Sequence, residues 1–414
     1  MKRDPPPATP EPADIPPHPE PAATPGPAPA GSEKVSAASL KPEGSPAAPG
    51  ETPPALPGDE RRREMTACAL QLAAECGFEL AGVSELHLPP EEINSYVAWL
   101  ERREYGSMDY LPRGLELRLD PRKLLEGALA VLSVGLIYRS REQHPQAPDQ
   151  AVYSRYAWGR DYHKVMKGKL KRLSAGLLAA FPEYRGRAFA DSAPVFEKLY
   201  ASQAGLGSKG KNSLLISRTL GSEFFIGEII TSLPLAPTPR EDWDPCQSCH
   251  ACVDACPTGA LSGDRTVNAA RCLAYLTIES PDPIPQELCP ALGSRIFGCD
   301  ACQGICPWNR RRIFTSEPDF ACRLTPQLAS LEYLLTMDEE QFLMVFQGSV
   351  IRRPGWAGFM RNVLAAAGNS GQPHLLPLIR RFADHANPML RTQARWAAEH
   401  LEDSLAKEAD QGSR

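Results

Sequence analysis

The chain has 414 residues, 42% of them hydrophobic and 23% charged, with a formal net charge of −5 at pH 7. This length allows two or three domains with buried cores, and the hydrophobic content is ordinary for a soluble protein. Residues 1–60 hold four Lys/Arg and nine Asp/Glu, so the remainder is nearly neutral. Affinity for a polyanion must therefore come from a local patch, because bulk charge cannot supply it.

Residues 1–59 form a Pro/Ala/Glu-rich segment with almost no large apolar side chains. Such a segment cannot bury enough surface to offset its chain entropy, so it is predicted to be a disordered tail. Its charged start lacks the apolar core of a secretion signal. The most apolar run, 124–137, contains Glu126 and is too short to span a bilayer, so no membrane association is expected.

Residues 60–235 alternate predicted helices with predicted strands. Helices are expected over 61–76, 91–103, 164–180 and about 194–204, and strands over 78–83, 129–138 and 187–191. Helices that alternate with strands indicate an α/β domain.

A glycine-rich stretch runs from Gly205 to Gly210 and fits G-x-G-x-x-G. Nucleotide binding is disfavoured, because a helix is expected where the dinucleotide fingerprint needs a strand, and Asn212 follows Lys211 where a P-loop needs Ser or Thr. Two interpretations stay open: a loop whose backbone N–H groups approach a large ligand, or a plain turn.

Eight cysteines between residues 246 and 306 carry the clearest chemistry. The first four have the spacing C-x2-C-x2-C-x3-C-P, in which the fourth cysteine of bacterial two-cluster ferredoxins ligates the other cluster. The spacing predicts one [4Fe-4S] cluster on Cys246, Cys249, Cys252 and Cys306, and a second on Cys256, Cys272, Cys299 and Cys302.

Zinc and disulfides are the alternatives. Structural zinc prefers two separated C-x2-C pairs, and a disulfide framework suits a small secreted domain, so iron–sulfur is favoured. Residues 236–312 are therefore expected to form a ferredoxin-like module supplied by a low-potential electron donor. Oxygen-sensitive clusters and reduced thiols indicate a cytoplasmic location.

Residues 351–395 contain seven arginines and one acid, Asp384. Helices are expected over 358–369 and 388–401, and paired helices of this kind stack as repeats, so 313–404 should be helical and 405–414 flexible. Arginines along one face can neutralise phosphates. A solvated basic face is the alternative.

With these features the chain resembles the epoxyqueuosine reductase family over about residues 62–400. The likeness rests on the motifs at 118–121, 154–163, 191–197, 205–212, 221–228, 271–277 and 298–309. Ser208, Lys209 and Cys289 depart from residues common in that family.

The resemblance implies an α/β cobalamin-binding domain at 60–235, a ferredoxin-like two-[4Fe-4S] module at 236–312 and HEAT-like repeats at 313–404. It implies that a monomer reduces epoxyqueuosine to queuosine at the anticodon wobble position of tRNA. The reductant would be cob(I)alamin, made with electrons from the clusters. By position, the corrin would be lined by Arg118, Ser154, Asp191, Leu215, Ile226 and Ala274. The tRNA-binding face would include Arg352, Arg353, Arg361, Arg391 and Arg395.

Asp191 is the candidate proton donor for the departing epoxide oxygen. A free Asp has a pKa near 3.9, and lying against an apolar corrin face should raise it. Taken alone, the residues favour a different role, in which Asp191 or Ser192 caps the helix expected near Pro194; the family resemblance favours the proton donor. His163 half-matches the D-x-H-x-x-G pattern that presents a histidine to cobalt, but Met166 replaces the glycine, so His163 is expected to be structural.

Two other functions fit part of the sequence. A reductive dehalogenase would use the same two cofactors, but an amphipathic helix follows Arg61–Arg63 where its export signal would need an apolar run, and the basic C-terminal part is unexplained. A ferredoxin-type electron carrier leaves the large α/β domain without a role.

Overall fold

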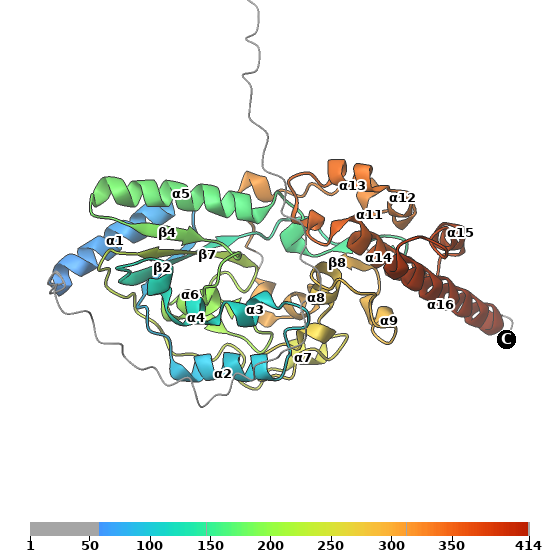
Figure 1. The fold of residues 1–414 in the computed structure, drawn as a ribbon, viewed down its shortest axis with the longest axis horizontal. Helices are drawn as coiled ribbons and strands as arrows, with labels where there is room; N and C mark the ends of the chain where they lie inside the picture. Colours follow the sequence, from blue (N-terminus) through green and yellow to red (C-terminus); the bar gives the residue numbers. More distant parts are fainter. Residues whose placement is uncertain (1–57, 146, 312, 413–414) are drawn as a thin grey trace, which may run out of the picture. The chain divides into compact units, whose positions relative to one another are not determined.

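The computed structural model describes residues 58–145, 147–311 and 313–412, so the predicted tail lies outside the described residues apart from Gly58 and Asp59. The described residues belong to one compact unit. The three regions predicted at 60–235, 236–312 and 313–404 pack together in it (Figure 1).

A four-stranded sheet organises the first region. Its strand order is β1-β2-β7-β4, and every neighbouring pair is antiparallel. The strands are β1 (Leu80–Ser84), β2 (Ala130–Ile137), β4 (Gly186–Phe189) and β7 (Phe224–Thr231). The mixture of helices and strands agrees with the predicted class, but β7, a central strand, was not predicted.

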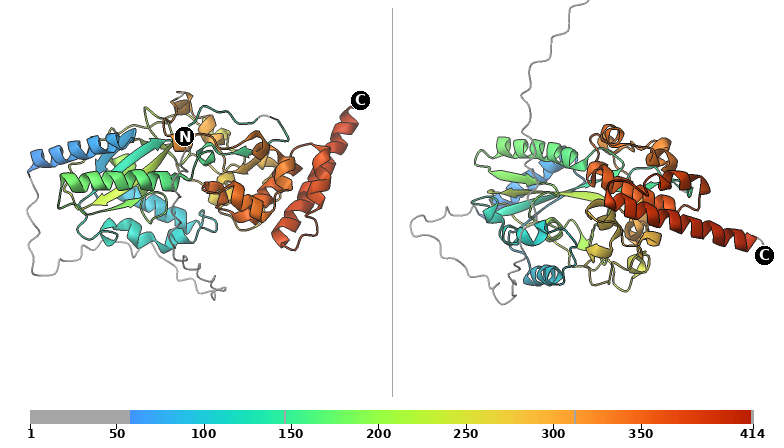
Figure 2. Two further views of the ribbon diagram at one scale, coloured as in Figure 1. Left: turned by 90° about the horizontal axis from the view of Figure 1, so that it is seen from above. Right: turned by 45° about the vertical axis from the view of Figure 1, so that its right-hand side comes forward.

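Helices cover both faces of this sheet. On one face α5 (Tyr162–Ala180) packs on β4 and β7 beside α1 (Asp59–Glu75), as Figure 2 shows from above. On the other face α6 (Glu197–Gln203) packs on β1, β2 and β7. Further helices of this region are α2 (Pro90–Glu101), α3 (Tyr110–Arg113) and α4 (Leu115–Leu119). The predicted helices at 61–76, 91–103 and 164–180 match α1, α2 and α5 within a few residues.

The cysteine-rich region is built from short elements. They are α7 (Ala251–Asp254), α8 (Leu273–Ile278), α9 (Cys289–Leu292), α10 (Ala301–Gly304) and β8 (Arg295–Phe297). β8 pairs in parallel with β3 (Val152–Tyr153), which joins this region to the first. A two-stranded hairpin, β5 (Ser208–Lys209) with β6 (Leu215–Ile216), completes the strands.

The C-terminal region is helical. It contains α11 (Pro326–Ala329), α12 (Leu331–Leu335), α13 (Glu339–Val345), α14 (Gly355–Gly368), α15 (Leu376–Arg380) and α16 (Pro388–Gly412). α14 packs against α12, α13, α15 and α16. α16 continues to Gly412, so residues 405–412 are helical, and the flexibility predicted for 405–414 stays a prediction.

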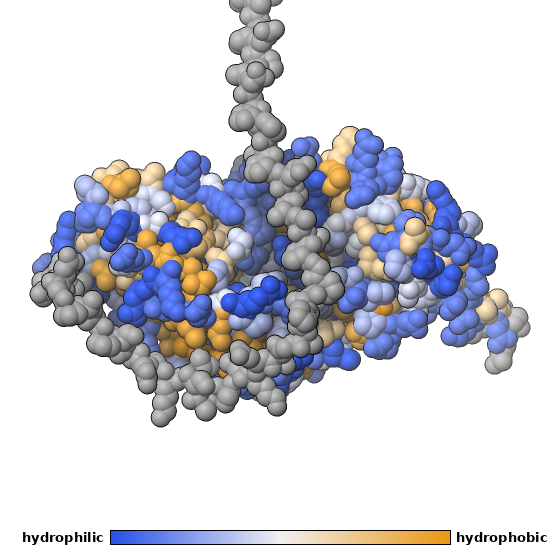
Figure 3. Space-filling view, in the orientation of Figure 1, coloured by the Kyte–Doolittle hydropathy of each residue, from blue (hydrophilic) through white to orange (hydrophobic). Residues whose placement is uncertain are grey.

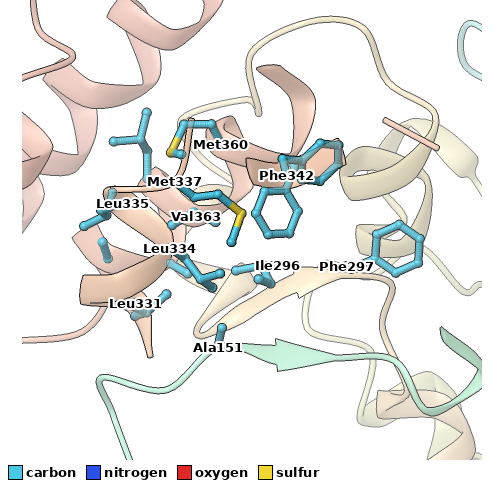
Figure 4. Close-up of a cluster of buried hydrophobic side chains, with 14 of the residues drawn as sticks. Ala151, Ile296, Phe297, Leu331, Leu334, Leu335, Met337, Phe342, Met360 and Val363 are labelled. Carbon is cyan, nitrogen blue, oxygen red and sulfur yellow. The ribbon is translucent and has the colours of Figure 1, made fainter. Parts of the chain in front are cut away.

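A large hydrophobic core lies where the C-terminal helices meet β8. Figure 4 shows side chains such as Leu334, Phe342 and Val363 gathered in one cluster with Ile296 of β8. All four are fully buried. Because burial of apolar surface is the main favourable term in folding, this core attaches the helical region to the cysteine-rich region.

Hydrophobic residues also reach the surface. In the face shown in Figure 3 they gather mainly over the sheet region, and the C-terminal helical part is mostly hydrophilic. Among the described residues, none of the helices combines the length and apolar character needed to cross a membrane.

Candidate functional site

The first cysteine group (Cys246, Cys249, Cys252, Cys306) lines a cavity of about 590 Å³. A tight turn brings Cys249 back over Cys246, since its N–H donates to the Cys246 carbonyl at 2.6 Å. Cys252 lies in α7, and Cys306 precedes a short 3-10 helix. Burial raises the pKa of Cys252, and the nearby thiols of Cys246, Cys306 and Cys249 raise it further. Four sulfurs therefore face one another across this cavity.

The second cysteine group (Cys256, Cys272, Cys299, Cys302) lies beside the first. Burial raises the pKa of Cys302, and Cys299 and Cys272 add to the effect. Burial also raises the pKa of Cys272, and the nearby Cys256 adds to this effect. Cys252 of the first group also raises the pKa of Cys302, so the two groups adjoin. Among the described residues, no three His, Cys, Asp or Glu side chains are arranged to hold a single metal ion.

A larger cavity of about 930 Å³ lies next to these elements. Its apolar walls include Tyr156, Ile278 and Phe297, and Arg118 and Asp191 supply polar groups. Ile278 ends the helix that follows Cys272, and Phe297 comes two residues before Cys299. Arg118 and Asp191 also line an adjoining cavity of about 380 Å³. The large cavity therefore lies close in the chain to two members of the second cysteine group.

Asp191 follows β4 and has a left-handed backbone, with φ of +60°. Asp tolerates this region better than most residues, although it is still an uncommon conformation that occurs often at functional sites. The backbone N–H of Asp191 donates to Glu197 Oε1 at 2.6 Å, which holds the loop in place. α6 begins at Glu197 and has no side-chain cap. Asp191 and Ser192 therefore do not cap this helix, and that alternative is wrong.

The carboxylate of Asp191 is held by two residues of the first turn of α5. Its Oδ2 accepts a hydrogen bond from the Tyr162 hydroxyl and lies 3.5 Å from His163 Nε2. His163 Nδ1 lies 2.8 Å from Asp161 Oδ1 on its other side. Tyr162 stacks on Phe225 of β7, with ring centroids 4.1 Å apart. The sheet therefore positions the partners of Asp191.

These contacts determine the charges of Asp191 and His163. Burial alone would raise the pKa of Asp191, but hydrogen bonds from His163 and Tyr162 outweigh it and the pKa is lowered. Burial opposes protonation of His163, but its bonds to Asp161 and Asp191 raise its pKa to about 9. The lowered pKa of Asp191 is opposite to the predicted direction. The mobile proton at neutral pH is therefore on His163, in contact with Asp191.

Sequence reasoning missed two of these partners. His163 was expected to be structural, and Glu197 was given no role; burial and then the Asp191 charge raise the pKa of Glu197 to about 8. The signal that could have indicated His163 was the Asp161-x-His163 pattern itself, whose aspartate caps α5 and orients the ring.

The predicted corrin-lining residues are only partly brought together. Arg118 and Asp191 line the large cavity, but Ser154, Leu215, Ile226 and Ala274 are not among its lining residues. The Ser154 hydroxyl is buried and donates to Asp300, and Leu215 packs in a small core with Phe224. These four stay predictions.

The predicted tRNA-binding arginines differ in exposure. Arg352 is exposed and lines the large cavity, and Arg353 beside it forms a two-point ion pair with Glu279 at 3.1 and 3.0 Å. Arg391 and Arg395 donate to backbone carbonyls near their helix. Arg361 is fully buried and donates to the carbonyls of three residues. These are Leu276, Ser280 and Asp282. It cannot contact a phosphate there, so its assignment to the surface was wrong.

Comparison with known families and proteins gives a consistent result. The family model described as "Epoxyqueuosine reductase QueG, DUF1730" matches residues 118–192, and the "4Fe-4S double cluster binding domain" matches residues 245–309. An epoxyqueuosine reductase from Pseudomonas aeruginosa is 39% identical over 330 residues, covering 78% of this chain and 91% of the relative. One from Escherichia coli is 40% identical over 333 residues, covering 79% and 87%.

Two solved structures of epoxyqueuosine reductases are also similar to this chain. A crystal structure of epoxyqueuosine reductase with an epoxyqueuosine-modified tRNA-Tyr stem loop has a TM-score of 0.76 at 27% identity, covering 83% of this chain and 93% of that chain. The Bacillus subtilis epoxyqueuosine reductase, with its catalytic loop swung out of the active site, has a TM-score of 0.74 at 28% identity, with coverages of 83% and 94%.

Proposed function

The chain belongs to the epoxyqueuosine reductase family and is an oxidoreductase acting on tRNA, and we propose that it uses cobalamin in the large cavity and Asp191 as proton donor. The reaction converts epoxyqueuosine to queuosine at the anticodon wobble position. One observation carries the proposal: Asp191, whose carboxylate lies 3.5 Å from His163 Nε2, lines a cavity next to residues that adjoin the second cysteine group in the chain.

The residues of the large cavity fit a corrinoid. Its volume of about 930 Å³ and its continuation into a second cavity through Arg118 and Asp191 leave room for a large, flat ligand. Tyr156, Phe297 and Val350 provide apolar surface. Arg118 Nε is buried with no hydrogen-bond partner among the described residues. An orphaned buried donor is costly, so a ligand acceptor at this point would be favourable.

The cofactor and the protein would divide the chemistry. Cobalamin, reduced by single electrons, would supply the nucleophile for opening the epoxide, and a protein normally places and tunes such a cofactor. This chain's residues would then supply the proton, because an alkoxide is a poor leaving group. His163 holds that proton 3.5 Å from Asp191 Oδ2. Asp191 lines the cavity and would pass it to the epoxide oxygen.

Electrons would reach the cavity through the two cysteine groups. We assign Cys246, Cys249, Cys252 and Cys306 to one [4Fe-4S] cluster, and Cys256, Cys272, Cys299 and Cys302 to the other. The match to the double-cluster domain supports two clusters in this region. The second cluster would be nearer to the large cavity, because Cys272 leads directly into α8 and Cys299 closely follows Phe297.

The tRNA would approach the large cavity from the side of the C-terminal region. Arg113 and Arg352 line this cavity and form no ion pair with an acidic side chain among the described residues, so they are available to phosphates. Arg353, Arg391 and Arg395 are proposed as further contacts, on HEAT-like repeats formed by the C-terminal helices. The structural relative solved with an epoxyqueuosine-modified stem loop supports a substrate of this kind.

The direct test is anaerobic reconstitution with iron, sulfide and cobalamin, followed by an assay on tRNA carrying epoxyqueuosine. We expect about eight irons and one corrinoid per chain, with queuosine as the product. Protein with both clusters that neither binds cobalamin nor forms queuosine would refute the proposal.

A further inference from the structure

The glycine-rich stretch at 205–212 forms the β5–β6 hairpin, whose turn presents Lys211 and Asn212 to the first cysteine group. A Cβ on Gly207 would lie 2.4 Å from the Ile216 carbonyl oxygen, and one on Gly210 would lie 2.5 Å from Ile216 Cδ1. At Gly207 the close atom belongs to the backbone and cannot move aside, so this position requires glycine. The glycines are therefore explained by the close packing of this hairpin.

Lys211 is a buried cation in this turn, with 9% exposure. Its Nζ donates to the carbonyls of Gln247 and Cys249 at 2.9 and 3.0 Å and lies 3.2 Å from His250 Nε2. Among the described residues no carboxylate pairs with it. A buried charge is expensive unless it is paired, and these three acceptors satisfy the hydrogen bonds of the ammonium group but carry no net negative charge.

The same turn also places one donor against a cysteine sulfur and a second, unpaired donor beside the cysteine group. The Lys211 backbone N–H donates to Cys246 Sγ at 3.2 Å. Asn212 lines the cavity of the first cysteine group and is 6% exposed, and its Nδ2 is buried with no partner among the described residues. A single turn thus brings one cation, one N–H donor to Cys246 Sγ and one unpaired amide to the border of the first cysteine group.

An iron–sulfur cluster with four thiolate ligands is an anion, and an added electron makes it more negative. Net charge and hydrogen bonds to the sulfurs are among the features that set its reduction potential. A nearby cation favours the reduced form more than the oxidised form. A cluster held by the first cysteine group would place such a negative charge beside the turn that carries Lys211.

We propose that Lys211, assisted by Asn212, raises the reduction potential of the cluster on Cys246, Cys249, Cys252 and Cys306. This inference rests on the ligand assignment in the proposed function. The step is a one-electron transfer: the cluster gains one electron, the low-potential carrier loses one, and no bond forms or breaks. With Lys211 beside it, this cluster is easier to reduce than it would be in a neutral surrounding.

The test is a redox titration of the full-length, reconstituted protein, followed by the electron paramagnetic resonance signals of the reduced clusters. Lys211→Met should lower the reduction equilibrium constant of one cluster at least tenfold, which is about 59 mV for a one-electron couple. The other cluster should change less. Lys211→Arg keeps the charge and should stay close to the unchanged protein, as should Lys171→Met, whose lysine is exposed on α5.

The iron content of each variant determines how its reduction potential is interpreted. Lys211→Met with about eight irons and an unchanged potential would overturn the inference. If this variant loses iron, Lys211→Gln and Asn212→Leu are titrated in its place, and unchanged potentials in both would overturn it equally. The measurement needs no corrinoid and no turnover, so a failure of cobalamin binding would refute the proposed function without touching this result.

Discussion

Replacing Asp191 by Asn is the sharpest test of the proposed chemistry. Asn occupies left-handed backbone about as readily as Asp, so the φ of +60° can be kept. The amide oxygen can still accept from Tyr162, but the amide N–H groups are too weakly acidic to transfer a proton to the epoxide oxygen. Asp191→Ala is a poorer choice, because a left-handed alanine would cost about 1–2 kcal/mol and could move the loop.

The size of the effect follows from the role. A positioned general acid contributes about 10²–10⁴-fold to rate, so the single-turnover rate constant of Asp191→Asn should fall by that factor. Cobalamin affinity should change little, since Asp191 is one of many residues around the cavity. The loss should therefore appear in the rate constant at saturating substrate, with substrate affinity largely kept.

The assay follows conversion of epoxyqueuosine in an anticodon stem–loop under anaerobic conditions, with pre-reduced enzyme. Iron content and the corrinoid absorption spectrum show that the variant is loaded. Asp59→Asn, at the exposed start of α1, is the matched control. A fully loaded Asp191→Asn protein that reacts as fast as this control would refute the role of Asp191.

Three further outcomes are expected. The pKa of His163 is about 9, above the ordinary 6.5, so the stability that protonated His163 contributes is complete below about pH 6.5 and is lost as pH rises through about 9. Turnover should decline over the same pH range. His163→Gln should remove this decline from the pH profile of turnover. Arg352→Glu should weaken binding of the tRNA stem–loop and reduce its salt dependence, measured by fluorescence anisotropy, whereas Arg380→Glu, whose arginine pairs with Glu402, should change binding less. Arg361→Met should lower the unfolding free energy by about 3 kcal/mol, because an unsatisfied buried acceptor costs about 1–3 kcal/mol, and an unchanged denaturation midpoint would contradict the structural role.

Local patterns predicted the parts that local physics determines. The run at 130–137 is apolar, rich in β-branched residues and of strand length, and it forms the buried strand β2. The amphipathic pattern at 164–180 forms α5, whose Leu170, Leu173 and Leu177 face the core. The cysteine spacing predicted a double-cluster domain, which the family comparison confirms. Each of these signals lies within a short window of sequence.

The site depends on contacts between distant segments, which such windows cannot show. His163 and Asp191 meet because α5 packs on the sheet that ends in the loop after β4. β7 was missed because Gly227 and the buried Glu228 interrupt its apolar run; Glu228 is tolerated through its bond to Ser133 at 2.8 Å. No periodicity indicates a partner that lies on a neighbouring strand.

Two basic residues show why composition alone misleads. Arg361 counted toward a basic surface, yet its guanidinium is fully buried and joins α14 to the carbonyls of Leu276, Ser280 and Asp282. Leu276 lies in α8, the helix that begins directly after Cys272. The helical region is therefore bound to the helix that directly follows a proposed cluster ligand, and it would help to fix the position of that ligand. Lys211 also donates to backbone carbonyls, those of Gln247 and Cys249, but its turn borders the first cysteine group, where the proposed cluster would add a negative charge.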